Sequence, residues 1–339
     1  MRFGQITCVA ACLLASAGAA QAQAEFYKGK SIRIIIGYGA GGGYDLYARM
    51  AAEFMGRHIP GNPVFVPQNM PGAGSFVAAK YLYSVAPKDG TALGMLVQSL
   101  PLDAATGRAT GIDVTKMPYI GRLTSNIDLG IGKPGAKLSI EDARSREIKT
   151  ASTGGASPAV LLPTALNTYA GTKFRLILGY RGIADSLLAV ERGETDIAGA
   201  GGLASTLARH PSWIEKREAP ILYQAALERH PAIPHVPTIV ELANGDTGKA
   251  VMRALASTAV IGRSLISTPG VPAERIAILR KAFDAMVKDS AYLEAAKKRK
   301  VMLDPATGAQ MDKVAQDTLA MPKDIAAKVA ALLQPPKKK

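Results

Sequence analysis

The sequence predicts an α/β protein of two lobes, each a mainly parallel sheet flanked by helices. The chain has 339 residues, more than one small domain requires, so two lobes of similar size are expected. Apolar, strand-like runs alternate with helical stretches, and the connections between them are short and rich in glycine or proline. The alternation occurs near the start of the chain and again in its middle, which favours two separate sheets.

The first lobe is predicted from an unbroken alternation of strands and helices. An apolar, β-branched run at 31–38 stops at glycines and indicates a buried strand. Apolar residues then recur at steps of four, three and four over 44–58, the spacing of one helix face. A strand at 63–67, a helix at 75–85 and a strand at 91–98 complete a parallel arrangement that is covered on both faces.

The second lobe repeats this alternation with new residues. Ser139 followed by Asp142 predicts a capping box at the start of one of its helices. We expect strands at 128–132, 147–151, 174–180, 195–199 and 220–226, and helices at 139–144, 159–169, 184–192 and 203–209.

The C-terminal part of the chain is expected to return to the first lobe. The apolar segment 257–267 is predicted to be extended, and the sequence after Pro272 is helical in character. The predicted division is a first lobe of 25–122 together with 264–339, and a second lobe of 123–263, with strands that cross at the hinge.

Residues 1–24 have the pattern of a secretory signal peptide. Arg2 precedes an uncharged apolar run, and the small residues that follow permit cleavage near Ala22 or Ala24. The run is shorter than the roughly 20 apolar residues of a membrane-spanning helix, so we expect a soluble periplasmic protein. Both cysteines lie in this segment, so the mature chain offers no disulfide or thiol nucleophile. Lipoprotein cleavage at Cys12 is disfavoured, because too little apolar sequence precedes it.

The excess of basic residues does not indicate a nucleic-acid site. The formal net charge is +14, which would suit a polyanionic partner if the basic side chains formed one patch. They are concentrated instead toward the C-terminus, away from the glycine-rich loops, and the single tryptophan provides no series of stacking platforms. We therefore expect no nucleic-acid partner and a solvated basic surface.

The glycine-rich segment between the first strand and the first helix is the most informative motif. Gly37, Gly39 and Gly42 match the G-x-G-x-x-G pattern of dinucleotide-binding loops. The second strand ends at Gln68-Asn69 without the acidic residue that such a site requires, so we expect no nucleotide and no other cofactor. Backbone amides at the start of the helix can still bind a carboxylate, because the helix dipole favours negative charge there.

Asp45 lies in the first turn of that helix and allows two interpretations. It can cap the helix N-terminus, or it can accept hydrogen bonds from ordered water or from a ligand hydroxyl. Further glycine-containing loops follow predicted strands at 69–74, 153–158 and 179–182. Open α/β sheets bind ligands beyond the carboxyl ends of their strands, so four such loops divided between two lobes predict a binding cleft.

Several enzyme classes are excluded by what the sequence lacks. No G-x-S-x-G nucleophile elbow is present, the four histidines lie away from the glycine loops, and no pair of them has metal-ligand spacing. We therefore predict a binding protein without catalytic residues or a metal site. The rival hypothesis is an exported hydrolase with Asp45 as its base, for which the sequence offers no partner nucleophile.

Two stretches of the chain resemble a known family of receptors. They are GYGAGGGYDLYAR at 37–49 and QNMPGAGSFVAAKYLYSVAPKDGTALG at 68–94, and weaker similarities follow at 180–182, 192–196, 236–241 and 268–274. On these residues the chain resembles the tripartite tricarboxylate transporter receptors, the Bug (TctC-like) extracytoplasmic solute receptors. The resemblance covers nearly the whole chain that follows the signal peptide.

The resemblance implies a type II periplasmic-binding-protein (Venus flytrap) fold that closes around a small organic acid and hands it to membrane permease subunits. We expect a monomer. In such receptors the glycine loop and its aspartate help to hold one carboxylate, partly through water, and loops of the other lobe close over it. The expected ligand-binding residues are Tyr38, Gly41, Gly42, Asp45, Ala73, Ser99, Thr153, Gly154, Ser157, Tyr180 and Arg181.

The sequence departs from the family pattern at places that line the expected cleft. Ser75 follows Gly74 where many members have a further glycine, and Gly179-Tyr-Arg-Gly182 stands where a loop similar to Pro-Tyr-Lys-Gly is common. Arg181 could pair with a ligand carboxylate through two hydrogen bonds, or be a solvated arginine at a strand end. The sequence leaves open which acid is bound, and whether the protein serves transport or a signalling membrane protein.

Overall fold

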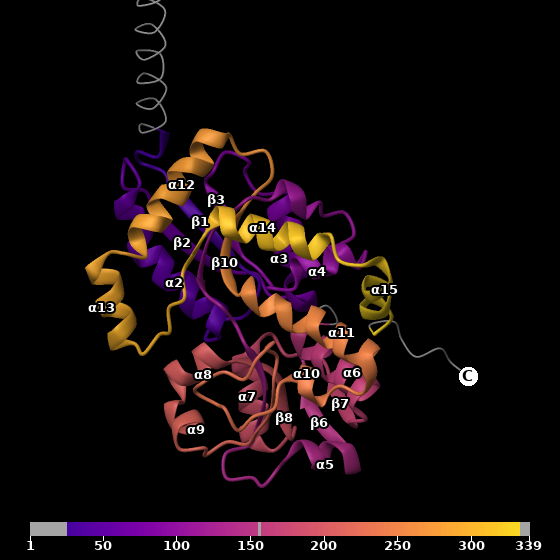
Figure 1. The fold of residues 1–339 in the computed structure, drawn as a ribbon. Coiled ribbons are helices and arrows are strands. Elements are labelled where there is room, and N and C mark those ends of the chain that lie inside the picture. The colour runs from indigo at the N-terminus through magenta and orange to yellow at the C-terminus, as the bar shows by residue number, and fades with distance from the viewer. Residues whose placement is uncertain (1–25, 155–156, 333–339) are drawn as a thin grey trace, which may run out of the picture.

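The computed structural model describes residues 26–154 and 157–332 and contains two sheets, one above the other in Figure 1, each flanked by helices. The predicted two-sheet α/β class is confirmed. The predicted signal peptide at 1–24 and the lysine tail at 334–339 lie outside the described residues. Within the described ranges, no helix is both long enough and apolar enough to cross a membrane.

The first sheet contains six strands. These are β1 (Ser31–Ile36), β2 (Val64–Asn69), β3 (Ala92–Met95), β4 (Tyr119–Thr124), β10 (Arg263–Ser267) and β11 (Ala306–Thr307). Their order across the sheet is β11-β4-β10-β3-β1-β2. β1 is parallel to β2 and to β3, whereas β10 is antiparallel to β3 and β4 and β11 is antiparallel to β4. The sheet is therefore mixed and not mainly parallel as predicted, because the C-terminal strands β10 and β11 return to it in the opposite direction.

Helices cover both faces of the first sheet. They are α2 (Gly43–Phe54), α3 (Phe76–Ser84), α4 (Leu100–Ala105), α12 (Ala273–Met286), α13 (Ser290–Lys298) and α14 (Gly308–Leu319). Ile34 and Ile36 of β1 pack on one side with residues of α2, α12 and α13. Ile35 points to the other side and packs with residues of α3 and α14. β1 is therefore buried on both faces, as its continuous apolar run predicted.

The second sheet contains five strands. These are β5 (Asp128–Gly132), β6 (Ile148–Ala151), β7 (Phe174–Ile177), β8 (Ile197–Gly202) and β9 (Ile221–Gln224). Their order is β7-β6-β8-β5-β9. β6 is parallel to β7 and β8, whereas β5 is antiparallel to β8 and β9, so this sheet is also mixed.

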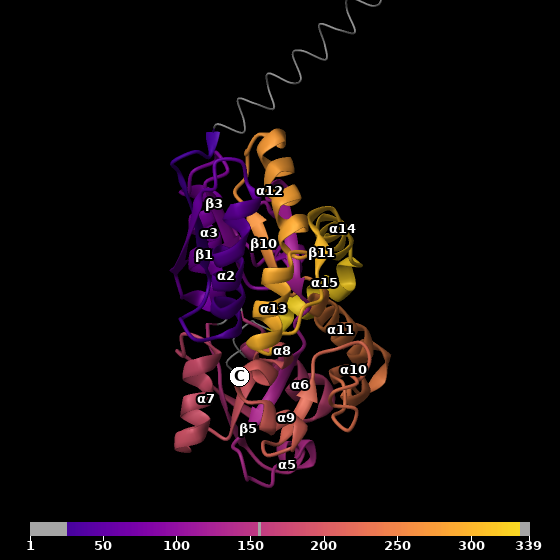
Figure 2. The same ribbon diagram turned by 90° about the vertical axis from the view of Figure 1, so that its left-hand side faces the viewer.

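The helices of the second sheet surround it in Figure 2. They are α5 (Ile140–Ser145), α6 (Pro158–Ala170), α7 (Ile183–Arg192), α8 (Leu203–Arg209), α9 (Pro211–Glu215), α10 (Ile239–Leu242) and α11 (Gly245–Ser257). The predicted capping box is confirmed: the Asp142 amide donates to Ser139 Oγ at 3.2 Å and the Ser139 amide donates to Asp142 Oδ2 at 2.8 Å. Val329 of α15 (Lys323–Ala331) packs into this core, so the last described helix lies against the second lobe.

Several segments differ from the predictions, which also lack α4, α9, α10 and the short strand β11. The segment 257–267 is extended only from Arg263 onward, because α11 runs to Ser257 and a 3₁₀ turn follows it. Neither α11 nor β4 was predicted. Two glycines in the first turn of α11 hide its helical pattern, and Arg122 interrupts the apolar run of β4. Arg122 is nevertheless buried there, because its guanidinium binds Asp304 and the Val260 carbonyl.

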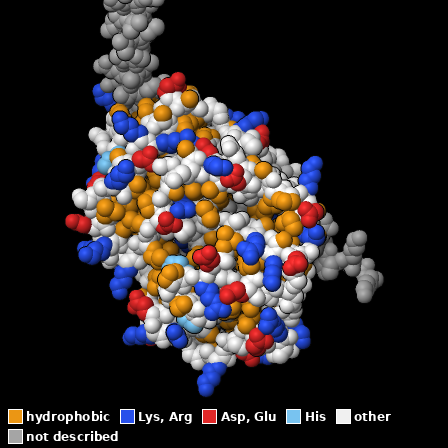
Figure 3. All heavy atoms as spheres, in the orientation of Figure 1, with side chains coloured by type: hydrophobic (Ala, Val, Ile, Leu, Met, Phe, Trp, Pro, Cys, Tyr) orange, Lys and Arg blue, Asp and Glu red, His pale blue; other side chains and the backbone are white. Residues whose placement is uncertain are grey.

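The two sheets are joined where β4 leads into β5 and where α11 leads back into β10. Residues 125–127 and the start of β10 therefore lie at the junction between the sheets. Basic and acidic side chains are interspersed on the face shown in Figure 3, as expected for a solvated surface. The lobe boundaries given above remain a prediction.

Candidate ligand-binding site

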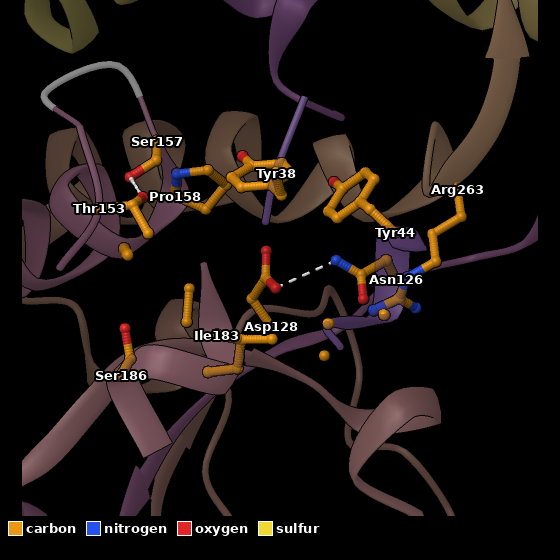
Figure 4. A pocket seen from close by; sticks show the side chains of 15 residues that line it. Tyr38, Tyr44, Asn126, Asp128, Thr153, Ser157, Pro158, Ile183, Ser186 and Arg263 are labelled. Carbon is orange, nitrogen blue, oxygen red and sulfur yellow. Dashed lines mark hydrogen bonds between the residues drawn. The ribbon is translucent and has the colours of Figure 1, made fainter. Parts of the chain in front are cut away.

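A cavity lies between the two sheets, and residues of both line it (Figure 4). Tyr38, Gly42 and Tyr44 contribute from the first sheet and its loops, and Thr153 and Ser186 contribute from the second. The cavity continues into two neighbouring recesses with which it shares lining residues. The predicted glycine loops therefore meet in one cleft, at the carboxyl ends of β1, β6 and β7.

Three helices of ten or more residues begin at this cavity without a side-chain cap. They are α2, α6 and α7, whose N-cap residues are Gly42, Ser157 and Gly182. Ser157 Oγ accepts a hydrogen bond from Thr153 Oγ1 at 2.6 Å, and no hydrogen bond to its own helix occupies it. The first amides of a helix carry partial positive charge and lack partners within the helix. The walls of the cavity therefore favour an anionic group.

Asp128, at the start of β5, places a carboxylate at the cavity wall (Figure 4). Gln98 Nε2 donates to its Oδ2 at 2.9 Å, and Asn126 Nδ2 donates to its Oδ1 at 3.0 Å. Asn126 Nδ2 also donates to Gln98 Oε1 at 2.7 Å, which fixes how both amides are oriented. Burial raises the pKa of Asp128 to about 6, although nearby Arg263 and the Asn126 hydrogen bond oppose that rise.

Arg263, the first residue of β10, is the largest fully buried side chain and also lines the cavity. Its guanidinium lies 5.5 Å from the ring centroid of Tyr44 and 5.0 Å from that of Tyr47. Nη2 donates to Ser205 Oγ at 3.3 Å, whereas Nε and Nη1 are buried without a hydrogen-bond partner in the described part of the chain. A buried cation with free donors calls for an anion.

Glycines make room for this arginine. A β-carbon on Gly43 would lie 2.3 Å from Arg263 Nη2. A β-carbon on Gly202 would lie 2.3 Å from the same atom and 2.2 Å from Asn126 Oδ1. Such distances are far below van der Waals contact, so any other residue at either position would displace the guanidinium. Only glycine at these two positions, at the starts of α2 and α8, therefore leaves room for the Arg263 guanidinium.

The structure gives Asp45 protein partners. Its Oδ2 accepts from the Gly41 amide at 2.9 Å, and its Oδ1 accepts from Arg49 Nε and Asn69 Nδ2, each at 2.9 Å. Asn69 Nδ2 also donates to the Tyr38 carbonyl at 3.0 Å. Asp45 is buried and lines neither the cavity nor its two neighbouring recesses. It holds the glycine loop against the end of β2.

The other predicted site residues divide by position. Ser99 lines neither the cavity nor its two neighbouring recesses, and its hydroxyl donates to Asp103 Oδ2 at 2.8 Å in the interior of the protein. The central cavity is lined by Tyr38, Gly42, Thr153 and Ser157, a neighbouring recess by Ala73, Gly154, Tyr180 and Arg181, and the other recess by Gly41. The Arg181 side chain is 74% exposed and its Nε lies 2.8 Å from Asp185 Oδ2.

The two halves of the molecule touch across the mouth of the cleft. The Gly39 amide donates to the Arg181 carbonyl at 3.1 Å, and Arg209 Nη2 donates to the Gly42 carbonyl at 3.3 Å. A β-carbon on Gly74 would lie 2.7 Å from the Ser157 nitrogen, so the loops pack backbone against backbone. The cleft is closed in this structure.

Sequence reasoning missed the polar residues at the junction between the sheets, namely Gln98, Asn126, Asp128 and Arg263. A signal for two of them was available. Asp128 is a charged residue at the edge of an apolar strand, and Arg263 stands within an apolar segment. Within the described ranges, no group of three or more histidine, aspartate or glutamate side chains could hold a metal ion.

Comparison with known proteins places these features in context. A family model described as tripartite tricarboxylate transporter family receptor matches residues 47–330. A UPF0065 protein in the gbd 5' region of Cupriavidus necator is 28% identical over 251 residues, which are 71% of this chain and 72% of that protein.

Two solved structures from Rhodopseudomonas palustris share the fold. MatC with bound malate is 18% identical, with a TM-score of 0.69 over 89% of this chain and 99% of that chain. A second protein, solved with adipate, is 20% identical, with a TM-score of 0.66 over 89% of this chain and 98% of that chain. At these identities the similarity shows the fold alone, and it confirms the predicted two-lobe architecture.

Proposed function

The chain belongs to the tripartite tricarboxylate transporter receptor family, and we propose that it captures a small organic acid between its two lobes in the periplasm. It then delivers the acid to the membrane permease subunits of a tripartite transporter. Membership of a receptor family agrees with the prediction of a non-enzymatic binding protein. The proposed lobes are 25–122 with 264–339, and 123–263, apart from α15, whose Val329 packs into the core of the second lobe. The lobes separate to admit the acid and close over it.

The observation that carries this proposal is the set of hydrogen-bond donors that meet at the cavity. Three uncapped helix N-termini and the free donors of Arg263 meet there, and all of them favour a carboxylate. Two structures that share this fold were solved with small organic acids, malate and adipate. Tyr38 and Tyr44, whose rings lie 4.7 Å apart, supply an apolar surface for the carbon skeleton of the acid.

Asp45 takes a positioning role in this proposal. It fixes the loop whose amides face the acid, and does not contact the acid itself. Tyr38, Gly42, Thr153 and Ser157 line the cavity and are proposed as ligand contacts. Tyr180 and Arg181 close the adjacent recess from the second lobe.

A thermal-shift screen of di-, tri- and monocarboxylates, followed by calorimetry, tests the receptor function. A bound acid should raise the melting temperature, because it stabilises only the folded state. Uptake of the same acid by cells should require both this receptor and the permease subunits. Failure of every acid to shift the melting temperature would overturn the proposal, as would conversion of the acid to a product during incubation.

A further inference from the structure

We propose that the captured acid carries a hydrogen-bond donor, a hydroxyl or an ammonium group, beside its carboxylate, and that Asp128 selects for that donor. The inference rests on the proposed function and narrows its ligand class. It concerns a residue that belongs to none of the glycine loops, that lines the cavity together with Asn126, and that is hydrogen-bonded by Asn126 and by Gln98.

The hydrogen bonds around Asp128 favour an acceptor that faces the cavity. Each carboxylate oxygen receives one amide donor, Gln98 Nε2 on Oδ2 and Asn126 Nδ2 on Oδ1. Donors on both oxygens stabilise the ionised form, which accepts hydrogen bonds and donates none. An ionised carboxylate has about four lone-pair positions, so two of them stay free for a ligand. In Figure 4 the carboxylate points into the middle of the cavity, toward Tyr38.

The surroundings give Asp128 no strong cation of its own. Arg263 lowers its pKa, but burial has the larger effect and the pKa is raised to about 6. The guanidinium of Arg263 lies instead beside Gly43 and Gly202, where its Nη2 binds Ser205. A carboxylate that is ionised at neutral pH and only partly compensated gains from a donor that arrives with the ligand.

The cavity wall therefore carries two unlike groups. Arg263 and the start of α2 favour the carboxylate of an acid, and Asp128 favours a hydroxyl or ammonium group. An acid without such a donor would place a methylene group or a second carboxylate against Asp128. The first leaves a buried acceptor unsatisfied, and the second brings two like charges together in a poorly solvated space.

Calorimetry at neutral pH with matched acids tests this selection. The sets are succinate, malate and aspartate; glutarate, 2-hydroxyglutarate and glutamate; and adipate, 2-hydroxyadipate and 2-aminoadipate. In the set that binds tightest, we expect the hydroxyl- or amino-bearing member to bind about 10- to 100-fold more tightly than the plain acid. The two substituted members show which donor Asp128 prefers. Equal or tighter binding of the plain acid overturns the proposal.

Variants separate a selecting role from a structural one. Asp128→Ala should reduce the preference to about threefold or less, chiefly by weakening the substituted acid, while the plain acid binds as before or better. Asp128→Asn provides a second, more conservative change if the alanine variant is unstable. The control is Asp317→Asn on the exposed face of α14, which should keep the full preference. An undiminished preference in both Asp128 variants contradicts the proposal.

The outcomes also distinguish the two proposals. If no acid of any set binds, the proposed receptor function fails. If plain acids bind best and take up one proton, as calorimetry in buffers of different ionisation enthalpy would detect, the receptor function stands. In that case Asp128 becomes protonated when the acid binds, and the proposal that it selects a donor-bearing acid is wrong.

Discussion

Two aspartates beside the cleft are equally buried and differ in what surrounds them. Asp45 and Asp128 are each 5% exposed. Asp45 accepts hydrogen bonds from a backbone amide, from Arg49 and from Asn69, so its charge is compensated within the first half of the molecule. Asp128 accepts from two neutral amides and faces the cavity. The aspartate inside the recognisable motif holds the loop in place, and the aspartate outside the motif faces the cavity.

Two buried arginines on neighbouring strands show the same contrast. Arg122 of β4 donates to the Val260 carbonyl at 2.7 Å and to Asp304 Oδ2 at 2.9 Å. Arg263 of β10 has two nitrogens without partners in the described structure. Burying an arginine without enough hydrogen-bond acceptors is unfavourable. We therefore expect a ligand to supply the acceptors that Arg263 lacks. Both arginines are buried, so it is their hydrogen-bond partners that distinguish the structural Arg122 from the proposed ligand-binding Arg263.

Replacing Arg263 should have the largest effect on binding. Arg263→Met keeps the volume and removes the free donors, so we expect about 100-fold weaker binding of the acid, equivalent to about 2.7 kcal/mol. Without ligand, the variant loses a desolvated charge but Asp128 loses a nearby cation, so we expect the free energy of unfolding to change little. Calorimetry and urea unfolding measure the two quantities.

Arg122→Met is the matched control for that change. It should lower the free energy of unfolding by about 1–2 kcal/mol, chiefly because the Val260 and Asp304 carbonyls lose their donor, whereas the exposed Asp304 carboxylate can be solvated by water. The affinity of the folded variant for the acid should stay within about threefold of wild type. If the two arginine variants behaved alike, the distinction between partnered and unpartnered charges would be lost.

Asp45→Ala should act mainly on stability. The change removes acceptors from the Gly41 amide and from Asn69, so we expect a loss of about 2–3 kcal/mol in the free energy of unfolding. Asp128→Ala should instead affect the affinity for a donor-bearing acid more than the free energy of unfolding. An Asp45→Ala protein of normal stability that binds the acid more than about tenfold more weakly would show instead that Asp45 contacts the ligand.

The strands and helices with regular patterns could be predicted from the sequence, and the binding charges could not. Gly37, Gly39 and Gly42 mark a strand-to-helix turn because local backbone geometry requires them, so the loop is visible in the sequence. Asp128 and Arg263 become neighbours only when β10 returns from the second half of the molecule to pair between β3 and β4. Side-chain partners across more than one hundred residues leave no local pattern.

The stability difference between wild type and Asp128→Asn should depend on pH. The pKa of Asp128 is raised to about 6 by burial, above its ordinary 3.8 in an unfolded chain, so the folded state holds the proton more tightly. Its contribution to stability is therefore present below about pH 4 and is lost as the pH rises through 6. The variant should gain about 2 kcal/mol relative to wild type between these limits. A difference that does not vary with pH would contradict this assignment.

Arg181→Ala should have the smallest effect. Its side chain is 74% exposed and paired with Asp185, and exposed pairs contribute little. We expect no resolvable change in the melting temperature and less than about threefold in affinity. A loss of tenfold or more, measured by calorimetry, would favour the other interpretation of the sequence, in which Arg181 turns inward and pairs with the ligand carboxylate.

The most direct test is a crystal structure of the receptor with the acid that gives the largest thermal shift. We predict one carboxylate of the acid within hydrogen-bond distance of Arg263 Nε or Nη1 and of the first amides of α2. A donor group of the same acid should contact Asp128. An acid bound elsewhere, or one that leaves the Arg263 nitrogens without a partner, would contradict the account.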